Sequence, residues 1–290
     1  MSLSEQDIKN SWLQVGQRFA DDNPAFVKTW NHVLFNSRPW QVHPYVNPVA
    51  QLIGYLRSLM YVCQQSLYSI EQINELRDKE QDNINTWYVS LHFYDFIARV
   101  KTATDLLALL IRHIFAIDKT KLPDEHCSLH TLKISGILSS QNPTPLKKNL
   151  AVTLKESKEE WIEKFYPLRN FVVHQPGFLF TGPPYNTIHP AGSYIYVPFP
   201  YKNVNSSITF DRLRPLESLK PLADAGEPLS VFLRQIESTS LNHTNHLMVE
   251  PLTLCEEIWV KLSHLIDKVI TQCHPQIFTF LTDNEDIGKP

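Results

Sequence analysis

The chain has 290 residues, of which 43% are hydrophobic and 11% aromatic, so it can bury a large core and is not a disordered polypeptide. Its 27 basic and 30 acidic residues give a net charge of −3, so there is no global basic surface that would attract a polyanion, and any nucleic-acid contact must be local. The four cysteines are far apart in the sequence and form no CxxC pair, which argues against a disulfide framework and a cysteine-based zinc site.

The first residues, MSLSEQDIKNSW, are acidic and polar where a secretory signal has positive charge followed by an apolar core. The longest apolar run, residues 106–117, is interrupted by Arg112 and His113 and is too short to span a bilayer. We therefore expect a cytoplasmic protein with no membrane anchor.

Four segments have the apolar periodicity of helices. Residues 4–35 begin with a capping-box-like pattern, so residues 1–48 are expected to form a helical extension that ends in a proline-bearing loop. Residues 49–76 carry one apolar stripe, residues 86–117 are apolar around much of their circumference, and residues 251–280 would close the bundle. These patterns predict a mainly α protein with segment 86–117 at the centre of a helical bundle.

Two charged residues of that central segment have more than one interpretation. Asp95 and Arg99 are four residues apart, which places them on one face of a helix, where they could pair at the surface. The other interpretation gives Arg99 and Asp95 a supporting, substrate-binding role beside an active site.

Residues 118–155 contain several prolines and are predicted to form a loop with one short helical piece at about 128–138. Within it, Asp124-Glu-His-Cys127 and His130 have the residue types of a metal site. They lack the distant second pair of ligands that a structural zinc site needs, so we expect a polar loop without a metal. With only 8 glycines and no Gly-x-Ser-x-Gly elbow, the chain also lacks the motifs of ATPases, Rossmann enzymes and α/β hydrolases, and no cofactor is expected.

The most informative stretch runs from Tyr166 to His174, YPLRNFVVH, after a capping-box pattern at residues 157–160 that predicts the start of its helix. On a helix, Asn170 and His174 lie one turn apart on one face, and Arg169 projects from the neighbouring flank. A guanidinium binds phosphate through a planar fork, and an imidazole transfers protons near neutral pH. The patch therefore suits the binding and cleavage of a phosphodiester.

Pro167 leaves two possibilities for the backbone of this helix. It kinks the helix, or a new helix begins near it, in which case free N–H groups close to Arg169 would add attraction for phosphate. His174 must lie at the helix C-terminus, because Pro176 and Gly177 follow, and there the dipole favours its charged form.

The proline-rich segment 176–248 is a poor helix former. Two runs, residues 193–199 and 207–211, are predicted to form strands of an inserted β-hairpin. The aromatic stretch 178–185 is expected to pack this insertion onto its own core, with stacking on unpaired bases as a second possibility.

The six residues RNFVVH resemble the R-x4-6-H motif of the HEPN superfamily, helical-bundle proteins that commonly act as RNases in toxin–antitoxin, defence and RNA-processing systems. The Asn directly after the Arg is the polar residue that this motif favours, and the apolar residues before the His also fit. The resemblance covers roughly residues 49–280, of which only the motif is specific. It implies one HEPN-like domain over residues 1–290, extended by residues 1–48 and interrupted by the insertion at 176–248.

The resemblance also implies a mechanism. The 2′-hydroxyl of RNA attacks the adjacent phosphate without a metal and leaves a cyclic phosphate. His174 is then the general acid and base, Arg169 stabilises the charge that develops on phosphate, and Asn170 orients His174 or the phosphate. Each subunit supplies half a site, so the partners implied are an RNA substrate, a second copy of the chain in a homodimer, and an antitoxin or other regulatory protein.

A second reading belongs to a different class of protein. Many members of this superfamily keep the bundle without catalysis, so the chain could instead be a catalytically inactive dimeric scaffold or a module that binds nucleotides or RNA. The absence of a basic field and the awkward Pro167 favour that reading.

Overall fold

The computed structural model divides the chain into two compact units. Unit 1 comprises Met1–Tyr68, Arg99–Glu163 and Val260–Pro290, and unit 2 comprises Ser69–Ala98 and Lys164–Trp259. The structure describes residues 5–36, 48–77, 83–131, 133–140, 143–163, 165–166, 169, 188–189, 192–193, 195–199, 213–215, 245–249 and 251–284.

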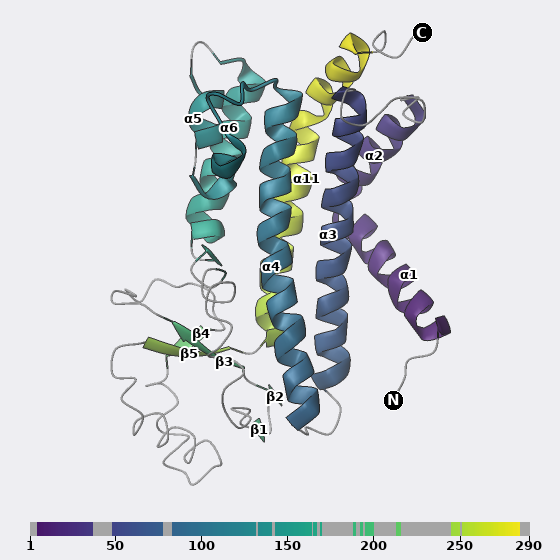
Figure 1. Ribbon diagram of the computed structural model, residues 1–290, viewed down its shortest axis with the longest axis vertical. Coiled ribbons are helices and arrows are strands. Elements are labelled where there is room, and N and C mark those ends of the chain that lie inside the picture. Colours follow the sequence, from purple (N-terminus) through teal and green to yellow (C-terminus); the bar gives the residue numbers. More distant parts are fainter. Residues whose placement is uncertain are drawn as a thin grey trace. The chain divides into compact units, whose positions relative to one another are not determined.

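The described residues are mainly α-helical, as predicted. Their α-helices are α1 (Glu5–Asp22), α2 (Pro24–Asn36), α3 (Pro48–Arg77), α4 (Asn83–Ile114), α5 (Lys133–Leu138), α6 (Pro145–Ser157) and α11 (Pro251–Asp283) (Figure 1). Three short turns complete the helical part: the 3₁₀ turns η2 (Asp124–His126) and η3 (Leu129–Thr131), and the π-helical turn η4 (Lys158–Ile162).

The three long helices predicted from apolar periodicity are confirmed as α3, α4 and α11. Helix α4 buries a broad apolar face, as its apolar pattern predicts. Its buried apolar residues are Val89, Phe93, Phe96, Ile97, Val100, Ala103, Leu107, Ala108, Leu110, Ile111 and Ile114.

The first periodic segment forms two helices, α1 and α2, that meet at Asn23. Asn23 is buried, and its side-chain Nδ2 donates a hydrogen bond to the carbonyl oxygen of Phe19 at 3.1 Å. Pro24, which has no N–H to donate, is the first residue of α2. The chain therefore changes direction between two amphipathic helices without leaving a buried donor unpaired at Pro24.

The loop predicted for residues 118–155 is wrong at its end, because it contains helix α6. Thr144 caps this helix by accepting a hydrogen bond from the N–H of Lys147, and Pro145 occupies its first turn, where proline is tolerated. The capping box predicted at residues 157–160 is wrong as well: Ser157 has a helical backbone and makes no side-chain cap, because α6 continues directly into η4.

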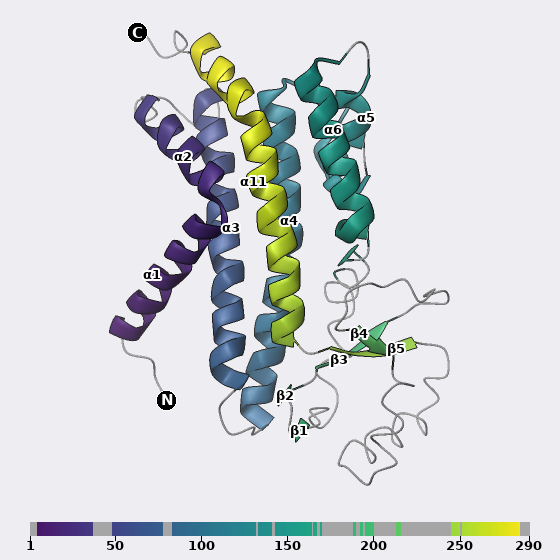
Figure 2. The ribbon, with the colours of Figure 1, turned by 180° about the vertical axis from the view of Figure 1, so that it is seen from behind.

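Within unit 1, helices α3, α4, α6 and α11 alternate in direction (Figures 1 and 2). His113, near the end of α4, makes a hydrogen bond through Nε2 to the carbonyl oxygen of Pro48 at the start of α3, with a length of 2.8 Å. Gln276 of α11 donates to the carbonyl oxygen of Ile114 at 3.4 Å, which brings the C-terminal ends of α4 and α11 together. Helix α3 is therefore antiparallel to both of them.

Helix α6 is antiparallel to α11. Gln272 donates to Thr153 Oγ1 at 2.9 Å, and one turn earlier in α11 Lys268 donates to Glu156 Oε2 at 3.4 Å. The order of α3, α4, α6 and α11 is thus the up-down-up-down arrangement of a helical bundle. The bundle predicted from sequence is confirmed for unit 1.

The C-terminus of α4 is closed by a Schellman motif. Ile117 N–H donates to the carbonyl oxygen of Arg112 at 2.9 Å, and Ala116 N–H donates to that of His113 at 3.1 Å. Ala116 has a φ of 48°, in the left-handed region that glycine usually occupies at this position. This cap turns the chain sharply into the loop that follows α4.

The described strands of unit 2 form two small antiparallel sheets. In one, β1 (Ile188–His189) pairs with β2 (Gly192–Ser193). In the other, β5 (Asn245–Val249) lies between β3 (Ile195–Phe199) and β4 (Leu213–Pro215).

The β-hairpin predicted between residues 193–199 and 207–211 is not seen. Residues 195–199 do form a strand, but this strand pairs with β5, while residues 207–211 lie outside the described part of the chain. The pairing places Ile195 opposite Val249 and Val197 opposite Leu247, so apolar residues meet across the two strands. A local pattern favours the nearer apolar run as the partner of residues 195–199, whereas residues 245–249 are remote in sequence.

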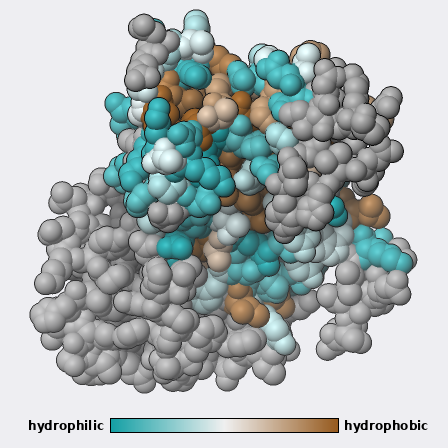
Figure 3. Space-filling view, turned by 45° about the horizontal axis from the view of Figure 1, so that its top comes forward, coloured by the Kyte–Doolittle hydropathy of each residue, from teal (hydrophilic) through white to brown (hydrophobic). Residues whose placement is uncertain are grey.

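No helix in the described part of the chain is both long enough and apolar enough to cross a membrane. Hydrophobic residues nevertheless reach the surface, shown in brown at the top of the view in Figure 3. The most exposed large apolar side chains that the structure describes include Phe35 of α2 at 88% and Leu13 of α1 at 72%.

Candidate functional site

The helix that leads toward the predicted motif changes its winding before it reaches Arg169. Helix α6 passes into the π-helical turn η4, whose Trp161 and Ile162 are buried. Lys261 of α11 donates to Glu160 Oε1 at 2.8 Å and so fixes the exposed side of the same turn. Single π-helical turns within helices occur frequently at functional sites.

Arg169 is the member of the predicted catalytic set that the structure describes. Its backbone is helical and its side chain is partly buried. The guanidinium carbon lies 5.7 Å from the ring centroid of Tyr166, three residues earlier, which is a cation–π geometry. This contact holds the guanidinium over the ring of Tyr166.

Asn170 and His174, the other two predicted catalytic residues, lie outside the described part of the chain, and so does Pro167. The geometry of the motif is therefore described at Arg169, and the roles assigned to Asn170 and His174 remain predictions.

The two predicted supporting residues are engaged with helix α3. Asp95 accepts a hydrogen bond from Ser69 Oγ at 3.0 Å, and Arg99 donates through Nη1 to Gln65 Oε1. Asp95 belongs to unit 2, together with Arg169, whereas Arg99 belongs to unit 1. These hydrogen bonds give both residues a structural role that joins consecutive helices, and their substrate-binding role remains a prediction.

The surroundings of Asp95 on α4 disfavour charged side chains. Burial lowers the pKa of His92, an effect that the nearby carboxylate of Asp95 opposes. Burial also raises the pKa of Tyr94 above its usual range. Both groups are therefore held in their neutral forms near pH 7, as expected for a helix at the centre of a bundle.

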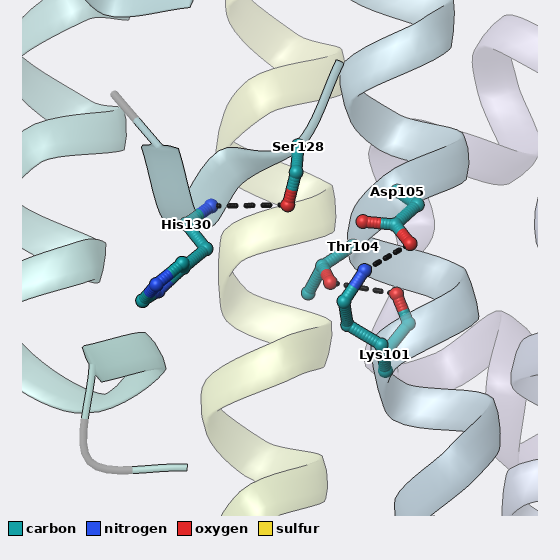
Figure 4. A network of polar contacts seen from close by, with 5 residues as sticks. All are labelled: Lys101, Thr104, Asp105, Ser128 and His130. Atoms are coloured by element: carbon teal, nitrogen blue, oxygen red, sulfur yellow. Dashed lines mark hydrogen bonds and ion pairs between the residues drawn. The ribbon is translucent and has the colours of Figure 1, made fainter. Parts of the chain in front are cut away.

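A second group of polar side chains lies further along α4 in unit 1 (Figure 4). Lys101, which is only 9% exposed, forms an ion pair with Asp105 one turn later. Thr104 donates to the carbonyl oxygen of Lys101 at 2.8 Å. A buried ammonium with a carboxylate partner avoids the large cost of an isolated charge, so removal of either partner would be destabilising.

His130 lies near this pair but points elsewhere. Its backbone N–H donates to Ser128 Oγ at 3.3 Å, and its ring extends away from Lys101 and Asp105 (Figure 4). Burial lowers the pKa of His130, and the positive charges of Lys158 and Lys101 lower it further, against the opposing effect of Glu163. The imidazole is therefore neutral near pH 7, which suits packing better than phosphate binding.

Asp124 and Cys127, two residues of the candidate metal cluster, have other surroundings: one is ion-paired and the other is buried. Asp124 pairs with the nearly buried guanidinium of Arg112, which holds the pKa of that carboxyl below its usual range. Cys127 is buried, and burial raises the pKa of its thiol to about 11. Across the ranges that the structure describes, no three His, Cys, Asp or Glu side chains are grouped in a way that could hold a metal ion.

Lys101, Asp105 and His113 belong to no motif that the sequence displays. The four-residue spacing of Lys101 and Asp105 is a visible signal for an ion pair, although nothing in it indicates burial. The partner of His113 is the carbonyl oxygen of Pro48, which is remote in sequence and which no local pattern predicts.

Comparison of the chain with protein-family models, with curated proteins and with solved structures found no match. A function can therefore be proposed only from the chemistry and positions of this chain's own residues.

Proposed function

We propose that this protein is an endoribonuclease that cleaves RNA without a metal ion, with Arg169, Asn170 and His174 as its catalytic residues. The observation that carries the proposal is the stretch RNFVVH in a chain whose described part is mainly helical. The helical backbone and partly exposed side chain of Arg169 support it, because a phosphate can be gripped only by a guanidinium that solvent reaches.

In the proposed reaction, the 2′-hydroxyl attacks the adjacent phosphorus, a bond forms between phosphorus and O2′, and the bond to O5′ breaks. One imidazole accepts the proton of the 2′-hydroxyl, and a protonated imidazole donates a proton to the departing O5′. Two copies of His174 in a homodimer would divide these two tasks. The products are one end with a cyclic phosphate and one end with a 5′-hydroxyl.

Arg169 has the electrostatic role in this scheme. Negative charge accumulates on the phosphoryl oxygens as the attacking bond forms, and a guanidinium already oriented by Tyr166 can stabilise that charge without first reorganising. A planar fork also suits two oxygens of one phosphate, a geometry that a lysine cannot reproduce.

The test uses the purified full-length chain and a single-stranded RNA in the presence of a chelator. We expect fragments with cyclic-phosphate and 5′-hydroxyl ends. His174→Ala and Arg169→Ala should each lower the cleavage rate by about 100-fold or more. Matched controls are His264→Ala and Arg57→Ala, which remove an exposed histidine and an exposed arginine from α11 and α3.

The two readings of the motif give different results in this experiment. Cleavage that persists at the parent rate in the His174→Ala protein would refute the proposal. Dimerisation and RNA binding by the parent without any cleaved product would instead indicate the catalytically inactive scaffold. If expression of the parent arrests growth and expression of His174→Ala does not, a toxin or defence setting is supported.

A further inference from the structure

Unit 1 contains a pocket of about 550 Å³ at the end of its bundle. The first turns of α3, the C-terminal turns of α4 and α11, and the loop after α4 line it. This volume lies within the range of about 300–1,000 Å³ that is typical of small-molecule sites in proteins. The pocket shares no residue with the proposed RNA-cleaving motif.

One wall of the pocket is aromatic. The ring of His113 contacts the rings of Tyr55 and Phe280, with centroid separations of 5.5 Å and 5.0 Å and the ring planes tilted by 58° and 54°. Because a carbonyl oxygen can only accept, the contact of His113 Nε2 with Pro48 O at 2.8 Å places the proton of the neutral imidazole on Nε2. The wall therefore offers flat surfaces for a planar ligand, and His113 Nδ1 remains an acceptor.

Hydrogen-bond acceptors come from α11. The side-chain amides of Gln276 and Asn284 use their nitrogens to donate to the carbonyl oxygens of Ile114 and Phe280, at 3.4 Å and 2.7 Å. Each amide oxygen can still accept a hydrogen bond. The carboxylate of Asp283, which also lines the pocket, adds further acceptor capacity. This side of the pocket suits a ligand with N–H donors.

Positive charge comes from the side formed by α4 and its following loop. Lys119 is exposed and lines the pocket. Burial lowers the pKa of His113, the hydrogen bond to Pro48 opposes that shift, and the nearby positive charges of Arg112 and Lys119 lower the pKa further. Lys147 places a second ammonium 5.8 Å from the ring of Phe115. An anionic group of a ligand would be favoured on this side.

We infer that this pocket binds a small planar aromatic molecule that carries N–H donors on its ring and an anionic substituent. The ring lies against Tyr55, His113 and Phe280, the N–H donors bind the acceptors of α11, and Lys119 binds the anion. An aminoaryl carboxylate and a nucleoside monophosphate share this chemistry, and the two can be distinguished directly by experiment.

Binding is measured by isothermal titration calorimetry on the full-length chain, with 2-aminobenzoate and adenosine monophosphate as the anionic probes. Aniline and adenosine are the matched probes that lack the anionic group. We expect at least one anion to bind about ten-fold more tightly than its uncharged counterpart, a difference of about 1.4 kcal/mol. The anion that binds identifies the source of the ligand as a carboxylate or a phosphate.

Paired variants locate the site. Lys119→Glu should weaken binding of the anion by about ten-fold or more, whereas Lys121→Glu, on the same loop but outside the lining, should change it by less than about two-fold. Phe280→Leu should weaken binding of both the charged and uncharged probes, and Phe278→Leu, two residues away on the exposed side of α11, should not. Far-ultraviolet circular dichroism confirms that each variant is folded.

Two results would overturn the inference. One is the absence of binding by either anion at concentrations up to about 1 mM. The other is binding by Lys119→Glu and Phe280→Leu with the parent affinity, which would place the ligand elsewhere. Because RNA cleavage is not the readout, failure here leaves the proposed ribonuclease activity untouched.

Discussion

Arg112→Met is the substitution whose effect follows most directly from the structure. Arg112 is 5% exposed, and its Nη1 donates to the carbonyl oxygen of Leu122 at 2.9 Å while Nη2 pairs with Asp124. Leu122 is fully buried, so its carbonyl oxygen would lose its guanidinium donor when methionine replaces arginine. The guanidinium thus ties the loop after α4 to the last turn of that helix.

The expected loss has two contributions. A buried carbonyl left without its donor costs about 1–3 kcal/mol. The carboxylate of Asp124 is 66% exposed, so its ion pair contributes no more than about 1 kcal/mol after screening by solvent. Methionine keeps most of the apolar packing of the arginine stem, and we therefore expect the free energy of unfolding to fall by about 1–4 kcal/mol.

The assay is equilibrium unfolding in urea, followed by tryptophan fluorescence and by circular dichroism. Arg112→Met should lower the midpoint by roughly 0.3–1.3 M if the urea m-value is about 3 kcal/mol per M, and by more if it is smaller. Asp124→Asn is the matched control, because it removes the charge and keeps the carbonyl bond, and its midpoint should move far less. If Arg112→Met and Asp124→Asn unfold at the same urea concentration, the buried bond to Leu122 contributes nothing and the reasoning is wrong.

Three further outcomes are expected. Arg112 lowers the pKa of Asp124 below its ordinary value of 3.8. The Arg112–Asp124 pair therefore stabilises the fold above that pH, and this stabilisation is lost as the pH falls through the folded pKa. The difference in urea midpoint between the parent and Asp124→Asn should shrink in acid. Ala116→Gly should raise the melting temperature, because alanine pays about 1 kcal/mol for its left-handed conformation and glycine does not. The greater entropy of the unfolded glycine variant offsets part of this gain. Burial lowers the pKa of His113 below 6.5, opposed by the hydrogen bond to Pro48 and aided by the charges of Arg112 and Lys119. The unfolded chain therefore binds the proton more readily, and this residue reduces stability as the pH falls below 6.5; an NMR titration should place its midpoint below 6.5.

Apolar periodicity was sufficient to predict the long helices, because each of them buries a continuous face or is buried nearly all round. Periodicity does not predict helix α6, because a proline indicates a loop and a helix start equally well: Pro145 follows a capping threonine and begins the helix. The letters of a capping box at Ser157 do not mark a helix start, because the backbone there is already helical and offers no free N–H groups to cap.

Local spacing was a weaker guide to the surroundings of the site. The four-residue spacing of Asp95 and Arg99 allows a pair on α4 but gives no sign of their hydrogen bonds to Ser69 and Gln65 on α3. Partners on a neighbouring helix depend on the register between helices, which a single sequence does not reveal. The motif at Arg169 was found because its residues are close in sequence and share one chemistry.

The small net charge constrains how an RNA chain could be held at that motif. A chain with a charge of −3 gains no long-range attraction to RNA, so binding must come from contacts at the site. On a single strand, each neutralised phosphate contributes about −0.7 to the slope of log affinity against log salt concentration. A dimer that uses two copies of Arg169 to neutralise two phosphates would therefore show a slope of about −1.4. A slope several times steeper would require a basic surface in addition to the motif. A shallow slope would mean that the affinity for RNA comes mainly from stacking and hydrogen bonds, which are also the interactions able to select one sequence over another.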